Sequence, residues 1–322
     1  MNVRTVLLTG AGFSYDFGGF LRREMWEKLF NDRFLKENYP RINKLISEVP
    51  NYDYESIYSE VHANFCQEEG NAIDQVFLKL YKQLDESIRC VFWRHNAPRN
   101  VRELIDRFSR EYGGGEYFFT LNQDLLIERL FFSDVHIPGF NAGNRISLIR
   151  DKEFSDEYTY VVPSDLSNQE PLSVPKLHYL KLHGSFNWRS SDGHSRMVIG
   201  KNKRSQIASE PLLGFYFNTF EKELSREYGR LLVIGYSFLD EHINEVIAKS
   251  DMELHIVDRF DFNSFKKELI EKKPYGKEIE QRIFKSYYYP YPLIDIFPQV
   301  ATDSHAWRTI KESFFAKDNR DR

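Results

Sequence analysis

The chain has 322 residues, of which 41% are hydrophobic and 16% aromatic, so it has ample material for a core and is not a disordered protein. Its 44 Lys and Arg residues are balanced by 48 Asp and Glu residues, and the net charge of -4 argues against nucleic acid as a direct partner. No apolar stretch approaches the roughly 20 residues that span a bilayer, and two cysteines without a CxxC pair exclude a zinc ribbon and a disulfide framework. We therefore expect a soluble, cytoplasmic protein without a membrane partner.

A strand that feeds a glycine turn opens the chain. Residues 3–9 are mostly apolar and break at Gly10 and Gly12, which is typical of a parallel-sheet strand. Residues 20–112 then have helical periodicity, and we predict that they form an inserted helical lobe. The apolar positions of its longest helix share one face and are Ile73, Val76, Phe77, Leu80, Leu84, Ile88 and Val91.

The sheet resumes after this lobe. Residues 117–121 form a predicted strand that stops before Asn122, and residues 177–182 form another that stops before His183. Between them, residues 133–175 are rich in Gly, Asn, Ser, Asp and Pro, and we interpret them as a loop excursion.

A strand, a helix and a strand follow one another in the next part of the chain. Residues 231–234 and 254–257 have the pattern of buried strands, and residues 240–249 have that of a helix between them. This is the signature of a βαβ unit. The short basic run at 201–204 is interpreted as a solvated loop.

This order of elements predicts an α/β fold with a Rossmann-like parallel sheet and an inserted helical lobe. The Rossmann-like domain takes in residues 1–19 and 113–261, and the lobe takes in residues 20–112. The remaining residues, 262–322, are predicted to be a mostly helical C-terminal segment, interrupted by an aromatic run at 287–291.

Four short turns each follow a predicted strand directly, at residues 10–14, 122–124, 183–185 and 235–237. The carboxyl ends of parallel strands meet at one edge of an open sheet, and folds of this kind bind their ligands there. We therefore expect the four turns to build a single site.

The first of these turns fits a pyrophosphate. Its glycines allow the backbone to approach a phosphate closely, and the amides at the following helix start, with the hydroxyl of Ser14, can donate to it. The alternative is a tight turn that binds nothing, and the dehydrogenase fingerprint fails because Tyr15 takes the place of its third glycine. The candidate residues of the turn are Gly10, Ala11, Gly12, Phe13 and Ser14.

Asn122 and His183 are the candidate catalytic pair. Asn122 offers both a donor and an acceptor, which suit ribose hydroxyls or a water molecule. The neutral imidazole of His183 can act as a general base, and Gly184 beside it leaves room for a bulky ligand. Asp124 can accept hydrogen bonds from a carboxamide, or it simply caps the helix that follows.

The last two strand ends add further candidates for binding. Gly235, Tyr236 and Ser237 can contact a ribose, and Asp258 can bind ribose hydroxyls or the edge of an adenine ring.

A serine hydrolase is the rival interpretation of the same region. Ser237 stands in a turn similar to a nucleophile elbow, and Asp258 and His305 would complete a triad in the hydrolase order. Leu239 counts against this interpretation, because a glycine normally relieves crowding at that position of the turn.

In their order, these turns resemble the sirtuin family. The likeness is carried by Gly10-Ala11-Gly12-Phe13-Ser14, Thr120-Leu121-Asn122-Gln123-Asp124, Leu182-His183-Gly184-Ser185 and Gly235-Tyr236-Ser237. By this resemblance, residues 10–14 would bind the pyrophosphate of NAD+, Asn122 and Asp124 would face the nicotinamide ribose, and His183 would match the catalytic histidine of the family.

The features in which this chain differs from sirtuin deacylases determine which reaction we expect. Sirtuin deacylases carry a four-cysteine zinc module, whereas this chain has two cysteines, and no metal is expected. The chain is more similar to the sirtuin-like proteins of bacterial antiphage defence, which implies an NAD+ hydrolase that releases nicotinamide and ADP-ribose in an abortive infection. The resemblance also implies a homo-oligomer, or a complex with a separate ATPase or Argonaute-type sensor. An NAD-dependent protein deacylase and a non-enzymatic module that binds NAD or ADP-ribose are the alternatives.

Overall fold

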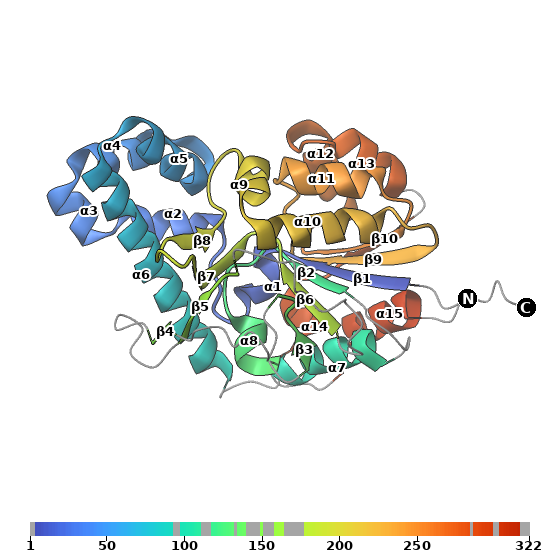
Figure 1. The fold of residues 1–322 in the computed structure, drawn as a ribbon. Helices are drawn as coiled ribbons and strands as arrows, with labels where there is room; N and C mark the ends of the chain where they lie inside the picture. Colours follow the sequence, from blue (N-terminus) through green and yellow to red (C-terminus); the bar gives the residue numbers. More distant parts are fainter. Residues whose placement is uncertain are drawn as a thin grey trace, which may run out of the picture.

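The computed structural model describes residues 4–92, 97–110, 117–131, 134–139, 149–150, 158–163, 177–283, 286–298 and 303–315. The centre of this described part is a seven-stranded sheet in which all paired strands are parallel (Figure 1). In spatial order the strands are β11 (Tyr287–Pro290), β10 (Glu253–Asp258), β9 (Gly229–Ile234), β1 (Arg4–Thr9), β2 (Tyr117–Thr120), β6 (Leu177–Lys181) and β3 (Val135–His136). The predicted α/β fold with a Rossmann-like parallel sheet is confirmed.

Helices cover both faces of this sheet, and the strands alternate their side chains between the two layers. Along β1, Val6 and Leu8 belong to the core on one face and Leu7 to the core on the other, as the two-residue period of a strand requires. The first face carries α9 (Lys203–Ser209), α10 (Pro211–Leu224), α11 (Glu241–Lys249), α12 (Phe262–Lys272) and α13 (Gly276–Ile283). The second carries α1 (Ala11–Tyr15), α7 (Ala97–Arg110), α8 (Leu126–Phe131), α14 (Leu293–Ile296) and α15 (His305–Phe314).

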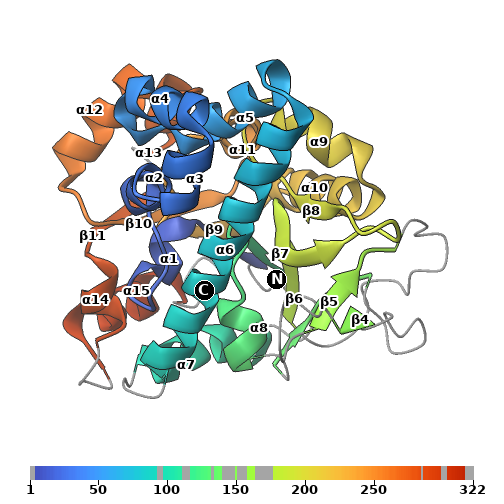
Figure 2. The same ribbon diagram turned by 90° about the vertical axis from the view of Figure 1, so that its left-hand side faces the viewer.

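A helical lobe with a core of its own stands beside the sheet and faces the viewer in Figure 2. It consists of α2 (Arg22–Phe30), α3 (Arg33–Asn38), α4 (Pro40–Glu48), a short 3-10 turn (Pro50–Tyr52), α5 (Tyr54–Asn64) and the first part of α6 (Gln67–Phe92). The predicted apolar stripe of α6 is buried from Ile73 to Ile88, and the side chain of Val91 lies outside the described part of the structure. Ile73 and Phe77 lie in the core of the lobe, while Leu84 and Ile88 lie in the core under the sheet. Helix α6 therefore ties the lobe to the sheet.

Helix α7 does not join the core of this lobe, although the sequence placed residues up to 112 in it. Leu104 and Phe108 of α7 instead share a core with Phe118 of β2. An amphipathic helix is stabilised wherever its apolar stripe packs against another apolar surface, and for α7 that surface is one face of the large sheet.

The sheet extends beyond residue 261, at which the sequence ended the Rossmann-like domain. The aromatic run that interrupts the C-terminal segment forms β11, which pairs with β10 through His255 and Tyr287 and through Val257 and Tyr289. Aromatic side chains favour strands, and this strand closes one edge of the sheet.

A smaller sheet lies beside the large one and has the order β4 (Ile149–Arg150), β5 (Tyr158–Val161), β7 (Gly184–Arg189) and β8 (Ser195–Met197). The predicted loop excursion therefore contributes β3, β4 and β5, and its residues 133, 140–148, 151–157 and 164–175 lie outside the described residues. Only Leu182 and His183 separate the end of β6 from the start of β7, so His183 lies where the chain passes from one sheet to the other. In the described part of the chain, no helix combines the length and the apolar character needed to cross a membrane.

Candidate active site

One cavity of about 1030 Å³ opens at the carboxyl edge of the sheet, between the ends of the central strands and the helical lobe. Parallel pairing brings these strand ends together, as expected for a ligand site of this fold class. The cavity has the size of a site for a large small-molecule ligand. Most of the predicted site residues line it, namely Gly10, Ala11, Gly12, Ser14, Asn122, Asp124, His183, Gly235, Tyr236, Ser237 and Asp258.

Phe13 is the predicted binding residue that the structure places elsewhere. Its side chain is buried in the core under the sheet, where the ring packs edge-on against Phe118 and Phe297. Its backbone amide donates to the carbonyl of Gly10 at 2.9 Å. Phe13 therefore anchors the turn, and its amide already serves the turn instead of a phosphate.

The glycines of the first turn pack against a second glycine turn, that after β9. The amide of Gly12 donates to the carbonyl of Gly235 at 2.9 Å. A Cβ atom on Gly10 would come within 2.7 Å of that carbonyl oxygen, and one on Gly12 within 2.8 Å of the Gly235 Cα. Gly235 itself has a φ of +64°, and its own Cβ would collide with the nitrogen of Phe13. Close contact between the two turns is enough to require all three glycines.

Asn122, Ser14 and Asp124 form a buried hydrogen-bonded chain. The side-chain amide of Asn122 donates to Ser14 Oγ at 2.6 Å, and Ser14 Oγ donates to Asp124 Oδ2 at 2.5 Å. The single hydroxyl hydrogen of Ser14 is therefore used, which corrects its expected role as a phosphate donor. Asp124 Oδ1 accepts from the amide of Leu126 at 3.0 Å and so caps α8, as the alternative interpretation of this residue held. Because the amide nitrogen of Asn122 is bonded to Ser14, its Oδ1 is the atom of this side chain that can bind a ligand.

A fully buried ammonium group fixes the backbone of this segment. Lys181 is the last residue of β6, and its Nζ donates to the carbonyl of Asp124 and, at 2.7 Å, to Glu128. Gln123 is held in the same way by buried contacts, because Tyr81 donates to its side-chain oxygen. Neither Asn122 nor its neighbours depend on a ligand for their position.

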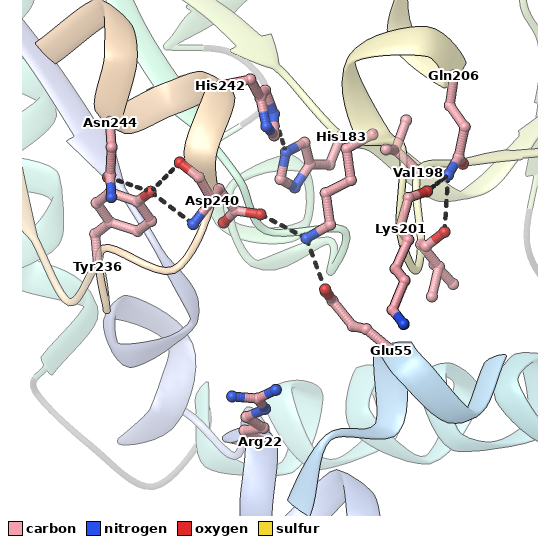
Figure 3. A network of polar contacts seen from close by, with 12 residues as sticks. Arg22, Glu55, His183, Val198, Lys201, Gln206, Tyr236, Asp240, His242 and Asn244 are labelled. Carbon is pink, nitrogen blue, oxygen red and sulfur yellow. Dashed lines mark hydrogen bonds and ion pairs between the residues drawn. The ribbon is translucent and has the colours of Figure 1, made fainter. Parts of the chain in front are cut away.

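His183 lies at the cavity wall next to a second histidine. Its Nε2 is 3.0 Å from Nε2 of His242, the second residue of α11, and the two rings point toward one another in Figure 3. Burial lowers the pKa of His183 well below its usual value and lowers the pKa of His242 to about 4, although the nearby Asp240 opposes this effect in both rings. Both imidazoles are therefore neutral near pH 7, and a neutral imidazole can accept a proton.

The sequence suggested that Gly184 leaves room for a ligand, but the structure shows that this space is filled. Gly184 has a φ of +70°, and a Cβ atom there would collide with the carbonyl oxygen of Arg196 in β8. This glycine lets the chain turn from the large sheet into the small one, which sets the position of His183 just before it.

Lys203 crosses the cavity wall and joins the lobe to the sheet domain. Its ammonium contacts Glu55 of α5 at 2.8 Å and Asp240 at 2.5 Å. Its side chain is only 11% exposed, so the basic run at 201–204 is not simply the solvated loop expected from the sequence. Burial alone would raise the pKa of Asp240, but Lys203 outweighs that effect and lowers it to about 2. Asp240 is thus the charged partner of this buried cation.

His183, Asp240 and His242 place one nitrogen or oxygen each within 4.8 Å of one another. Two imidazoles and a carboxylate are the ligands that zinc and iron prefer. The ammonium of Lys203, however, already lies against the Asp240 carboxylate and would repel a divalent cation. These three side chains therefore form a polar cluster in which the ammonium of Lys203 supplies the positive charge that a metal ion would otherwise bring.

The sequence analysis did not assign Asp240, His242 or Lys203 to the site, although the positions of Asp240 and His242 in the sequence could have indicated it. Asp240 and His242 come three and five residues after Ser237, so they belong to the same strand end as the predicted turn. A polar pair at the first turn of the helix that follows such a strand end lies at the carboxyl edge of the sheet. Lys203 left no such signal because its partners are distant in the chain.

The lobe contributes to the cavity as well. Arg22 at the start of α2 lines it and forms an ion pair with Asp53 at 2.6 Å. In Figure 3 its guanidinium projects toward the space between α5 and the strand ends. The side that the lobe presents to the cavity therefore carries charges of both signs, from Arg22, Arg23, Glu24, Asp53 and Glu55.

Tyr236 in the turn after β9 and Asp258 at the end of β10 are hydrogen-bonded to other protein groups. Tyr236 donates from its hydroxyl to Asn244 of α11 at 2.8 Å, away from the strand end. Burial raises the pKa of Asp258, whose Oδ1 accepts from the amide of Phe260 at 2.9 Å. Ser237 is exposed at the cavity.

The rival serine hydrolase finds little support in this geometry. The left-handed backbone of the turn lies at Gly235 and Phe238, with φ of 64° and 54°, and not at Ser237 as a strained nucleophile elbow requires. Among the contacts of the described residues, none joins Ser237 to Asp258 or His305.

The parallel sheet, the glycine turn after its first strand and the cavity at its carboxyl edge define an α/β protein of the Rossmann-like class. Residues 116–254 match the family model described as the SIR2-like domain, so this segment resembles a sirtuin domain, which fits an NAD-utilising enzyme. The resemblance to sirtuins that the sequence indicated is confirmed. The matched segment contains the candidate pair Asn122 and His183, together with Asp240, His242 and Lys203. A search of the curated proteins gave no match.

Proposed function

We propose that the protein is an NAD+ hydrolase that cleaves the bond between nicotinamide and ribose. One observation carries the proposal: Asn122 and His183 line the same cavity at the carboxyl edge of a sirtuin-like domain. Each is oriented by protein contacts, Asn122 by Ser14 and His183 by its position between β6 and β7. A site whose groups are held before the ligand arrives is suited to catalysis.

The two residues have different tasks in this proposal. Nicotinamide leaves as a neutral molecule from a cationic ring, so cleavage proceeds through an oxocarbenium-like transition state and needs little help at the leaving group. Oδ1 of Asn122 accepts a hydrogen bond from the attacking water or a ribose hydroxyl. The neutral imidazole of His183 accepts the proton that is released.

The size of the cavity and the guanidinium group of Arg22 support a dinucleotide ligand. The cavity volume of about 1030 Å³ is large for a single small metabolite. Arg22 on the lobe side supplies a guanidinium group, which suits a pyrophosphate. The turn at residues 10–14 lies at the same edge, and we retain it as the proposed site of the pyrophosphate, through its cavity-lining members rather than through Phe13.

Hydrolysis is proposed over lysine deacylation because of the cysteines. The chain has two, of which Cys66 is exposed and free, and two cysteines cannot supply a four-cysteine zinc module. By its resemblance to the sirtuin-like proteins of bacterial defence, we extend the proposal to depletion of cytoplasmic NAD+ during phage infection. That role includes a homo-oligomer or a partner sensor, of the ATPase or Argonaute type.

The test is product identification in isotopic water. Purified protein is incubated with NAD+ in H₂¹⁸O, with and without an acetylated lysine peptide, and the products are separated and weighed by mass spectrometry. We expect nicotinamide and ADP-ribose that carries ¹⁸O on its anomeric carbon. Acyl-ADP-ribose would identify a deacylase, and saturable binding of NAD+ without nicotinamide release, also with candidate partners present, would identify a regulatory module.

A further inference from the structure

We propose that His242 is a positioning residue for His183: it accepts a hydrogen bond from the Nε2–H of His183 and so keeps the other ring nitrogen of His183 free as a base. The inference rests on the proposed function, because it concerns the proton that hydrolysis releases. It adds a second histidine to the site, one that reaches the substrate only through His183.

The geometry of the two rings requires one of them to donate. Two Nε2 atoms 3.0 Å apart form a hydrogen bond only if one carries a hydrogen and the other offers a lone pair. If His242 donated, His183 would carry its hydrogen on Nδ1 and could not act as a base through that atom. If His183 donates, its Nδ1 is unprotonated. Among the described residues, no contact occupies Nδ1 of His183, whose side chain lines the cavity.

The surroundings of His242 favour the role of acceptor. His242 is the second residue of the nine-residue helix α11, where the helix dipole disfavours a positive charge on the free ring. The ring of Phe217 packs against it with centroids 5.7 Å apart, and Lys203 and Arg204 of α9 add positive charge nearby. A carboxylate, that of Asp240, is close to both rings and stabilises a positive charge once it forms on His183. His242 is therefore neutral, and its ring offers a lone pair to the Nε2–H of His183.

The proton transfer balances in a single step. The O–H bond of the attacking water or ribose hydroxyl breaks as its hydrogen bonds to Nδ1 of His183. One proton enters the pair, and the positive charge forms on His183, whose Nε2–H remains hydrogen-bonded to Nε2 of His242.

The experiment compares two substitutions of His242 that differ in a single property. His242→Gln keeps an acceptor oxygen near the position of Nε2, whereas His242→Phe keeps an aromatic ring without an acceptor. We expect the Phe variant to release nicotinamide about 10- to 100-fold more slowly than the wild-type protein, with unchanged affinity for NAD+. We expect the Gln variant to recover most of that loss. Equal rates in the two variants would overturn the proposal, as would loss of wild-type activity on treatment with a chelator, which would indicate a metal at the cluster.

A second measurement separates this inference from the proposed function. The ¹⁵N chemical shifts of the imidazole rings report which nitrogen of each ring carries a hydrogen, whether or not NAD+ turns over. We expect an unprotonated Nδ1 on His183 in the wild-type protein and a protonated one in His242→Phe. A protonated Nδ1 in the wild-type protein would contradict the role of His242 even in an active hydrolase. The expected shifts in a protein that does not cleave NAD+ would leave this role intact and overturn only the proposed function.

Discussion

The side-chain amide of Asn122 donates to the hydroxyl of Ser14 at 2.6 Å, across 108 positions of the sequence. This bond joins the loop after β2 to the turn after β1. It orients the amide so that the carbonyl oxygen of Asn122 remains for a ligand. The orientation of a proposed catalytic group thus depends on a residue that the sequence had assigned to phosphate binding.

Ser14→Ala tests this dependence. The substitution removes the acceptor for Asn122 and the donor to Asp124, so the amide of Asn122 loses its fixed orientation. We expect nicotinamide release to fall about 10- to 100-fold in kcat, with a much smaller change in KM. Steady-state kinetics check this, with the exposed Ser209→Ala as the control. A rise in KM at unchanged kcat would instead assign Ser14 to ground-state binding of NAD+.

Two glycine substitutions separate backbone strain from crowding. Gly235→Ala places a methyl group against the nitrogen of Phe13 at a φ of +64°, and we expect it to lower the free energy of unfolding by about 3 kcal/mol. Gly193 has a φ of +88°, but no atom lies within 4 Å of the position that a methyl group would take there, so Gly193→Ala should cost only about 1 kcal/mol. Denaturant unfolding measures both values. Equal losses would show that contact between the two glycine turns does not matter.

Removal of the Lys203 ammonium should destabilise the fold. Lys203→Met leaves the carboxylates of Glu55 and Asp240 without their buried cation, and we expect a loss of about 3–5 kcal/mol. Lys249→Met, which removes an exposed ion pair with Glu245, should leave the stability nearly unchanged. Thermal and denaturant unfolding of both variants provide the comparison. A Lys203→Met variant as stable as Lys249→Met would mean that the bridge does not hold the lobe in place.

His242 should make the stability of the protein depend on pH. Its pKa is lowered from 6.5 to about 4 in the folded chain, so its neutral form contributes stability that is complete above pH 6.5 and is lost as the pH falls toward 4. The unfolded chain binds the proton first, and protonation therefore favours unfolding. We expect the wild-type protein to lose on the order of 3 kcal/mol relative to His242→Gln between pH 7 and pH 4.

The comparison with His242→Gln is necessary because other buried groups titrate in the same range. The pKa of His255 is also lowered to about 4 by burial, and this histidine is present in both proteins. Urea unfolding at a series of pH values yields the difference between the two. A difference that stays constant with pH would show that His242 is not buried as a neutral ring.

The fold was predictable from the sequence because its signals are local. The strand at the start of the chain and those after 113 are apolar runs that end in glycine or polar turns, and parallel pairing then fixes where those turns meet. The convergence of residues 10–14, 122–124 and 235–237 followed from this rule alone.

The detailed roles were less predictable because they depend on contacts between distant segments. Whether Ser14 faces a phosphate or Asp124 depends on the spacing of β1 and β2, which no local pattern contains. Gly184 looked like space for a ligand, although β8 fills that space. Lys203 had the pattern of a surface residue, and only the packing of α5 and α11 around it made it a buried cation.

The most direct test of the central claim is the rate of nicotinamide release from saturating NAD+ by Asn122→Ala and His183→Ala, in variants shown by calorimetry to fold and to bind NAD+. The account predicts that each variant retains binding and loses at least about 100-fold in rate relative to the wild-type protein. Release at the wild-type rate by either variant would contradict the account.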